Sequence, residues 1–440
     1  MNKHMINKKW ASLVTALAVV CVLFTANSLA EKVTETLSLS VYQELEQVED
    51  FIDAKDYGQA LKIIQDMRSN FKLTQYESSQ VWNIEAYVYY LKEDYKKAIA
   101  TYNEVLKYEN LAEAVIQSTL KTVAQLHFIR EEYQPAIVAV SRLISRLDHP
   151  DISLYMLQGQ AYYQLKEYDK ALAPIKSAID VDKSAGKIPK ENTLLLLRAI
   201  YYEKKDFKNM VSVLKEVIQH YPKDSYLYSL AAIYSELGQT KKQMALTEVL
   251  FEKGYIEGEK HAVNLANLYL LHNLPYKAAQ LLQREVDNKR VQANERNLRL
   301  LSQAWYQARE DKKAIPPMQR AAEQSEKGEL YIRLAQSYLN LEQWSKAVKA
   351  IEQGLKKGGI KKPDTANIML GTALFNLKEL DKARKAFTTV AASKTKDNSR
   401  TAKTWLAFLD SEIRRSKLEQ ESAPAFERSL EAQENIEELS

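Results

Sequence analysis

Cysteine, glycine and proline are scarce in this chain of 440 residues, which contains 1 Cys, 11 Gly and 10 Pro. The single cysteine, Cys21, lies near the amino terminus, so the remainder has no disulfide, thiolate metal site or cysteine nucleophile. Glycine is present at about a third of its usual share, and the tight turns and phosphate-binding loops of α/β enzymes depend on glycine. The scarcity therefore predicts an almost wholly helical protein and argues against most nucleotide-binding folds.

Residues 1–30 have the pattern of a secretory signal peptide. Lys3, Lys8 and Lys9 precede an apolar run over residues 10–25, and small residues lead to a cleavage position after Ala30. We predict that this leader is cleaved and that the exported chain has no direct membrane span. The alternative is an uncleaved inner-membrane anchor, although the apolar run is shorter than the ~20 residues that a span needs.

Charge beyond the leader is nearly balanced. The leader has three lysines and no acid, so its removal lowers the formal net charge from +5 to +2. Residues 417–440 contain seven Glu against one Lys and one Arg, a local net charge of −5. The positive charge on the residues between is too dilute for a nucleic-acid-binding stripe, so we expect no nucleic-acid partner.

A skeleton of small and aromatic residues recurs along the chain. In residues 153–180 it forms two apolar stripes with helical spacing, separated by a short polar turn at 165–167. Each unit is therefore predicted to be a helical hairpin. The residue that opens the second helix recurs every 33 to 39 residues, as Ala60, Ala98, Ala136, Ala171, Met210, Gln243, Ala278, Ala314, Ala347 and Ala383.

The first helix of each unit carries an aromatic residue, usually with a small residue three positions earlier. Small residues allow two helices to approach closely, and the ring fills the space beside them. His127 occupies this aromatic position, so we interpret it as a packed core histidine rather than a metal ligand. The aromatic series is Tyr89, His127, Tyr162, Tyr201, Tyr234, Tyr269, Trp305 and Tyr338.

These residues resemble the tetratricopeptide repeat (TPR). The resemblance implies an all-α fold, a right-handed α-solenoid of about ten TPR helical hairpins over residues 38–392. A C-terminal capping helix is expected at 398–416, followed by an acidic disordered tail at 417–440. The pattern weakens at Met210 and Gln243, which replace the alanine, and at Pro316–Pro317. Two prolines inside a second helix predict that it kinks or restarts there.

No constellation of catalytic residues is found in the sequence. It has no glycine-rich phosphate loop, serine elbow, paired-histidine zinc helix or calcium loop. Its acids lie mainly in polar turns, and its histidines are scattered over different repeats. We therefore expect no enzyme activity, catalytic residue, metal or cofactor. An enzyme would instead require a polar pocket that holds acids with perturbed pKa values.

The residue after each core aromatic is predicted to point toward a concave groove lined by the first helices. With Phe375 as the corresponding position of the last unit, six of nine such positions are aromatic, and rigid rings give contact area at low entropic cost. The row therefore predicts a peptide-binding groove, unless each second ring packs against the next repeat. The predicted partner-binding residues are Asn83, Tyr87, Tyr90, Lys121, Gln125, Phe128, Gln160, Tyr163, Gln164 and Tyr202.

Four stretches, residues 80–91, 190–198, 308–317 and 370–377, are similar to one subgroup of repeat proteins. They resemble exported TPR proteins of Gram-negative bacteria associated with TonB-type energy transduction. This resemblance implies a non-enzymatic scaffold in the periplasm that binds a protein partner, with TonB-complex components as candidates. Such a protein would be an accessory of TonB-dependent iron or haem uptake. The alternative function is a cell-envelope assembly or secretion scaffold unrelated to TonB.

Overall fold

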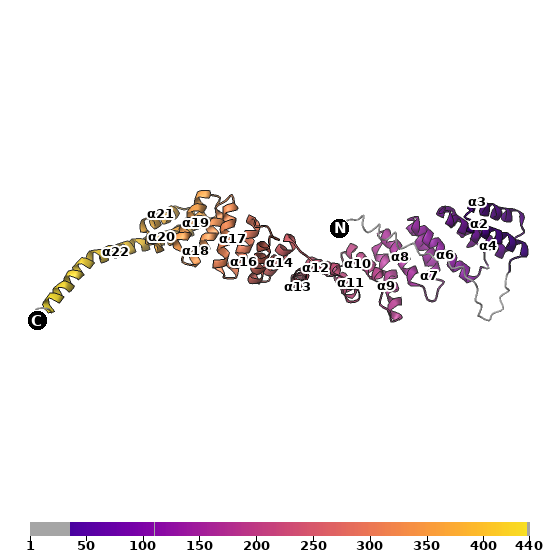
Figure 1. The fold of residues 1–440 in the computed structure, drawn as a ribbon, viewed down its shortest axis with the longest axis horizontal. Helices are drawn as coiled ribbons and strands as arrows, with labels where there is room; N and C mark the ends of the chain where they lie inside the picture. Colours follow the sequence, from indigo (N-terminus) through magenta and orange to yellow (C-terminus); the bar gives the residue numbers. More distant parts are fainter. Residues whose placement is uncertain (1–35, 110, 438–440) are drawn as a thin grey trace. The chain divides into compact units, whose positions relative to one another are not determined.

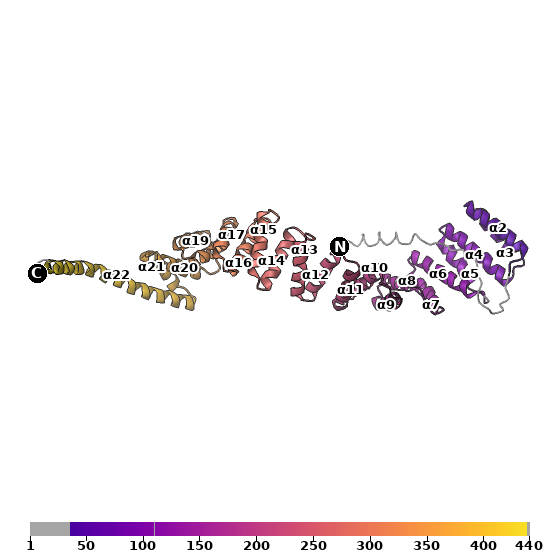
Figure 2. The same ribbon diagram turned by 60° about the horizontal axis from the view of Figure 1, so that its bottom comes forward.

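The computed structural model describes residues 36–109 and 111–437, and the regular structure within them is helical (Figure 1). Helices α2 to α21 form ten antiparallel pairs between Leu39 and Ala391, and α22 follows them. The pairing is the same in a second view (Figure 2). The prediction of an all-α chain of about ten hairpins is thus confirmed. The predicted leader, residues 1–30, lies outside the described residues.

The chain divides into two compact units, the first ending at Ala178 and the second beginning at Ile179, inside α9. The helices of the first unit are α2 (Leu39–Asp53), α3 (Tyr57–Asn70), α4 (Gln75–Leu91), α5 (Tyr95–Val105), α6 (Glu113–Ile129), α7 (Tyr133–Ile144) and α8 (Ile152–Gln164), with α9 (Tyr168–Ser184) crossing the boundary.

The second unit contains six of the hairpins and the long last helix. Its helices are α10 (Glu191–Glu203), α11 (Phe207–His220), α12 (Asp224–Glu236), α13 (Thr240–Glu252), α14 (Glu259–Leu271), α15 (Pro275–Asp287), α16 (Glu295–Gln307), α17 (Asp311–Gln324), α18 (Glu329–Asn340), α19 (Trp344–Lys357), α20 (Pro363–Asn376), α21 (Leu380–Ala391) and α22 (Lys396–Glu437).

The small residues of the repeat hold the two helices of each hairpin close together. The eight alanines that open second helices are fully buried, Met210 is 4% exposed, and Gln243 is half-buried. At Gly159 a Cβ atom would lie only 2.3 Å from Cδ1 of Ile175. The side chain at this position therefore sets the distance between the helices, as the spacing predicts.

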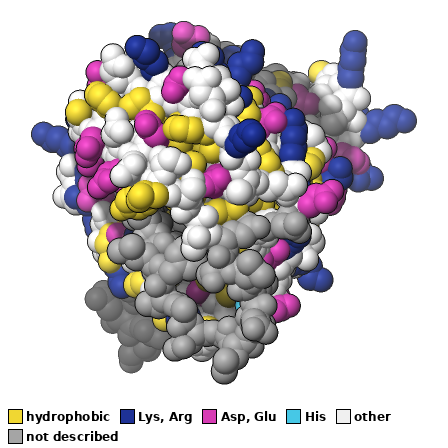
Figure 3. Space-filling view, turned by 90° about the vertical axis from the view of Figure 1, so that its right-hand side faces the viewer, with side chains coloured by type: hydrophobic (Ala, Val, Ile, Leu, Met, Phe, Trp, Pro, Cys, Tyr) yellow, Lys and Arg dark blue, Asp and Glu magenta, His cyan; other side chains and the backbone are white. Residues whose placement is uncertain are grey.

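The outer end of the first hairpin has no earlier repeat to cover it among the described residues. Helix α2 leaves Leu39 and Tyr42 exposed, at 72% and 54%. The end view of the first unit shows hydrophobic side chains mixed with charges of both signs (Figure 3). An end repeat of an array lacks one packing neighbour, which accounts for this exposure.

Helix α17 does not restart at its prolines. It is one helix from Asp311 to Gln324, with Pro316 and Pro317 inside it, so the prediction of a restart is wrong. The helix continues because Pro317 and Met318 are buried and hold it against its neighbours. Proline removes a backbone donor, however, and the carbonyl oxygens that precede these residues lose their helical partners.

Helix α22 begins as the predicted capping helix but is longer. Leu409 is fully buried, and the Trp405 ring stacks on Phe387 with 5.3 Å between centroids. The helix then continues to Glu437, through most of the range 417–440 in which the sequence predicts an acidic disordered tail. Most residues there are Glu, Gln, Leu, Lys, Arg and Ala, whose intrinsic propensity favours a helix, although Pro424 lies among them.

The ten hairpin turns share one backbone conformation. Each has a residue in the left-handed region, with φ between 56° and 65°, and the next N–H returns to the first helix. Only one of the ten is a glycine, so nine turns carry the strain of a side chain in this conformation. These residues are Lys55, Glu93, Glu131, Lys166, Lys205, Gly238, Asn273, Arg309, Glu342 and Lys378.

Replacing one of these side chains with glycine should stabilise the protein. For Lys205→Gly, with φ of 56°, we expect a gain of about 0.5–1 kcal/mol in the free energy of unfolding. The matched control is Lys208→Gly, in the first turn of α11, which should cost about 0.5–1 kcal/mol. Urea unfolding followed by circular dichroism measures both. Equal destabilisation by the two variants would contradict the strain argument.

A buried carboxylate ties the first two hairpins together. Glu77 is 3% exposed and accepts hydrogen bonds from the Ser38 hydroxyl (2.7 Å), the Ser38 N–H (2.8 Å) and the Thr74 N–H (2.9 Å). Burial alone raises the pKa of Glu77, but these hydrogen bonds to Ser38 and Thr74 outweigh it and lower the pKa to about 2. The ionised carboxylate therefore stabilises the folded state.

Because the pKa of Glu77 falls from 4.5 to about 2 on folding, its contribution should be complete above pH 4.5 and disappear as the pH falls toward 2. For Glu77→Gln we expect a loss on the order of 2 kcal/mol at pH 7, which shrinks progressively below pH 4.5. Urea midpoints measured across this range test the expectation. The control is Glu46→Gln, at an exposed position of α2. A difference from wild type that does not change with pH would contradict it.

Candidate functional site

The predicted groove residues lie on the first helices of consecutive hairpins. Nine of them are on α4, α6 and α8 of the first unit, and α6 contacts α8 directly. Tyr202 lies on α10 of the second unit, where it is 56% exposed. Lys121 and Gln164 are also exposed, and the other seven are half-buried. The structure thus places nine of the ten residues on first helices of the first unit, and of these helices α6 and α8 are in contact.

Three of the predicted rings pack inside their own hairpins. Each lies beside the aromatic residue five positions later. That aromatic residue is the first residue of the second helix, three positions before the repeat alanine. The ring centroids are 6.1 Å apart for Tyr90–Tyr95, 5.3 Å for Phe128–Tyr133 and 5.6 Å for Tyr163–Tyr168. The sequence alternative expected packing against the next repeat, whereas these rings bridge the turn of their own repeat. The rings are consequently held in place before any partner binds.

A cluster of tyrosines extends this arrangement on α4 and α5. Tyr87 stacks on Tyr90 at 6.3 Å with an interplanar angle of 17°. Tyr102 is 7% exposed, and burial, together with the nearby Tyr87 and Tyr90, raises the pKa of its hydroxyl. In the next hairpin, Nδ1 of His127 lies 2.7 Å from Oε2 of Glu132, again across the turn. Side-chain contacts therefore connect buried residues of these hairpins, such as Tyr102, with the predicted groove residues Tyr87 and Tyr90.

The polar members of the predicted groove are available to bind another molecule. Among the residues that the structure describes, their side chains have no hydrogen-bond or ion-pair partner. Carboxamides offer both donors and acceptors, which matches the alternating N–H and C=O groups of an extended peptide. The residues are Asn83, Lys121, Gln125, Gln160 and Gln164.

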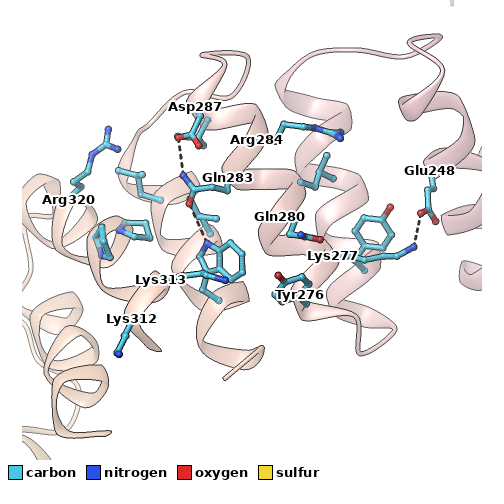
Figure 4. Close-up of a pocket in the computed structure, with 18 of the residues that line it drawn as sticks. Glu248, Tyr276, Lys277, Gln280, Gln283, Arg284, Asp287, Lys312, Lys313 and Arg320 are labelled. Atoms are coloured by element: carbon cyan, nitrogen blue, oxygen red, sulfur yellow. Dashed lines mark hydrogen bonds and ion pairs between the residues drawn. The ribbon is translucent and has the colours of Figure 1, made fainter. Parts of the chain in front are cut away.

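A cavity of about 980 Å³, which the sequence does not predict, lies in the second unit (Figure 4). Its walls are α15 and α17, both second helices of their hairpins, and its floor includes Leu298, Leu301 and Trp305 of α16. Pro316 and Pro317 line the wall that α17 forms. In the sequence, only the proline pair marks this position, and there it indicates a disrupted helix rather than a cavity.

Acids on α13 neutralise the cations that α15 directs toward the cavity (Figure 4). Glu248 pairs with Lys277 at 2.8 Å, and Glu252 pairs with Arg284 at 2.9 Å. The Trp305 indole N–H donates to Gln283 at 3.3 Å. Burial and the neighbouring Glu248 raise the pKa of the Tyr269 hydroxyl. The charged side chains Glu248, Glu252, Lys277 and Arg284 on the α13–α15 side of the cavity therefore already have partners within the chain.

In the described part of the chain, no three His, Asp or Glu side chains are grouped in a way that suits a metal ion. Over the same residues, no helix combines the length and apolar character required to cross a bilayer.

Comparison with known proteins gives the family. Sequence models described as tetratricopeptide repeat match residues 45–113 and 332–398 in one case and 152–184 in another. No curated protein sequence matches the chain.

Three solved structures are similar at low identity. The TPR2AB domain of yeast Sti1 in complex with pHSP90 is 16% identical, covers 61% of this chain and 99% of that chain, and has a TM-score of 0.34. A Parabacteroides merdae tetratricopeptide repeat protein has the same identity and coverage and a TM-score of 0.35. YrrB, described as having an unusual peptide-binding site, is 12% identical over 42% of this chain and 88% of that chain, with a TM-score of 0.33.

TM-scores of this size support no conclusion about the fold or the function of this chain. The family instead rests on the ten paired helices, the buried residues of the repeat and the segments that match the repeat models. The chain therefore contains tetratricopeptide repeats, and its ten helix pairs have the all-α architecture of a tetratricopeptide repeat solenoid.

Proposed function

We propose that this protein is a non-enzymatic scaffold that binds a protein partner through the faces of α4, α6 and α8. The observation that carries the proposal is the set of five unpartnered polar side chains beside rings already fixed by their own hairpins. A site with prearranged rings loses little side-chain entropy on binding. Its amides would then pair with the backbone of an extended segment.

The site of action proposed is the periplasm. The support is the leader at residues 1–30, which predicts export, and the four stretches that resemble TonB-associated repeat proteins. On this basis the scaffold serves as an accessory of a TonB-dependent uptake system. The second candidate, a scaffold for cell-envelope assembly or secretion, is supported by the same leader and the same groove.

The acids of the second-unit cavity favour a binding role over catalysis. Glu248 and Glu252 each form an ion pair with a cation of α15, and Asp287 accepts a hydrogen bond from Gln283, so none of the three lining acids is held as an isolated acid or base. A general acid–base pair instead requires groups that are free to exchange a proton with substrate.

The groove is best tested at its polar residues, because alanine at the rings would also disturb the hairpins. We expect Asn83→Ala, Gln125→Ala and Gln160→Ala together to weaken partner binding by at least about tenfold, through the loss of three hydrogen-bonding side chains. The matched control combines Gln65→Ala, Asn103→Ala and Gln134→Ala, at exposed positions of second helices. Both triple variants should keep the wild-type melting temperature.

A photo-crosslinking amino acid at Lys121 in the native periplasm provides the measurement, with mass spectrometry of the adducts. The groove variant should lose the adducts that wild type and control both give. If the two triple variants give the same adducts in the same yield, the groove is not the binding surface.

Growth on haem as the sole iron source separates the two candidate roles. A deletion strain should grow poorly on haem and normally in iron-replete medium if the protein supports TonB-dependent uptake. Wild type should restore growth, whereas the groove triple variant should not. Normal growth on haem together with increased detergent sensitivity would instead support the envelope-assembly role.

A further inference from the structure

The α17 wall of the second-unit cavity carries cations that the chain does not neutralise. Lys312 and Arg320 are exposed, and no described residue forms an ion pair with either. Lys313 lies between them along the helix, with Nζ 3.3 Å from Glu310 and 4.8 Å from the centroid of the Trp305 ring. Because Lys277 and Arg284 of α15 are already paired, the cations of the cavity without an ion pair to a described residue are Lys312 and Arg320 of α17. Asp287 of α15 also lines the cavity without a cation partner in the described part of the chain, and it accepts a hydrogen bond from Gln283 at 2.9 Å (Figure 4).

The same wall contains a backbone acceptor with no helical donor. In a regular helix the carbonyl of Lys313 would accept from the N–H of residue 317, or of residue 316 in a tighter turn. Both positions are proline and have no N–H, so neither bond forms. The Lys313 carbonyl oxygen therefore has no backbone donor within its own helix.

The floor of the cavity adds an apolar contact. Tyr276 is 44% exposed and meets Trp305 edge to face, with centroids 5.6 Å apart. Leu298 and Leu301 are almost fully buried beneath the cavity, so the exposed apolar surface is that of Tyr276 and of the Pro316 ring. A ligand that fits must supply carboxylates for the cations and an apolar side chain for the exposed rings of Tyr276 and Pro316. An acidic peptide segment that contains an aromatic residue has both.

We propose that this cavity binds the acidic C-terminal segment, residues 417–440, of a second copy of the chain. That segment has seven Glu and a net charge of −5, together with one aromatic residue, Phe426, directly before Glu427. Its charge is complementary to that of α17, and its composition meets each requirement of the cavity. The inference goes beyond the groove proposal and uses only the second unit and the tail.

A second copy supplies this segment more easily than the same chain. Helix α22 packs against α21 and α20, and Leu418, where the acidic segment starts, is 65% exposed. The segment continues this helix to Glu437, so it would have to unwind to return to α15 and α17 of its own chain. A neighbouring molecule can present it with α22 intact.

The proposed contact joins two different surfaces, so it is heterologous. Each copy carries one cavity and one tail, and association would add molecules head to tail. Because the contact pairs carboxylates with cations near solvent, added salt should weaken it.

Sedimentation velocity on the chain without residues 1–30 tests the proposal with two variants. The cavity variant is Lys312→Glu with Arg320→Glu, and the tail variant replaces the seven Glu of 417–440 with Gln. Wild type should form larger species as its concentration rises, and fewer in high salt. Each variant alone should associate at least tenfold more weakly.

An equimolar mixture of the two variants gives the decisive result. The tail of the cavity variant should enter the intact cavity of the tail variant, so the mixture should form dimers and stop there. The matched control, Lys349→Glu with Lys385→Glu, changes the same net charge at exposed positions of other second helices and should associate like wild type.

Three results would each overturn the proposal. One is a wild-type chain that stays monomeric at about 100 μM in low salt, which would leave the cavity to an acidic segment of another protein. The second is a cavity variant that associates like wild type. The third is a mixture of variants that forms no dimer. The groove proposal would survive all of them, because none of the substitutions lies in the first unit.

Discussion

The distance between the two helices of a hairpin is the constraint on which the rest of this structure depends. The fourth residue of each second helix lies where the two helices of the hairpin meet. Eight of these ten residues are fully buried alanines. At Gly159 even a Cβ would overlap Ile175. Where the position holds a larger polar residue, as at Gln243, it is only half-buried. Once this distance is set, few backbone conformations of the turn and few rotamers of the ring beside it fit the space that remains.

The turns show how the constraint acts on the backbone. A close antiparallel pair joined by three residues requires a reversal, and one residue in each turn takes the left-handed conformation. Glycine would be the least strained choice, but nine of the ten residues here have side chains. Helix packing therefore outweighs the local preference of Lys and Glu. The same reversal places Tyr95, Tyr133 and Tyr168 beside rings of the first helices.

The sequence predicts what depends on this local packing. The spacing of the alanines predicts the ten hairpins because each hairpin packs mainly on its sequence neighbours. The groove residues follow from the same geometry, although the ring contacts within a hairpin require knowing which rotamer each ring adopts. The division at Ala178, inside α9, corresponds to no feature of the repeat pattern. The extension of α22 depends on helix propensity, which the acidic composition of the tail concealed.

The proline pair of α17 shows why a surface is harder to predict than a core. A pair of prolines removes backbone hydrogen bonds from a helix, so the sequence alone predicts that the helix is disrupted there. The burial of Pro317 and Met318 holds the helix against its neighbours, and the lost bonds leave a backbone acceptor without a helical donor. Whether that acceptor matters depends on α15 and α16, which leave a space beside it and line it with aromatic rings. Repeat spacing constrains the faces that pack, whereas a face that must stay open for a ligand is constrained only by what binds to it.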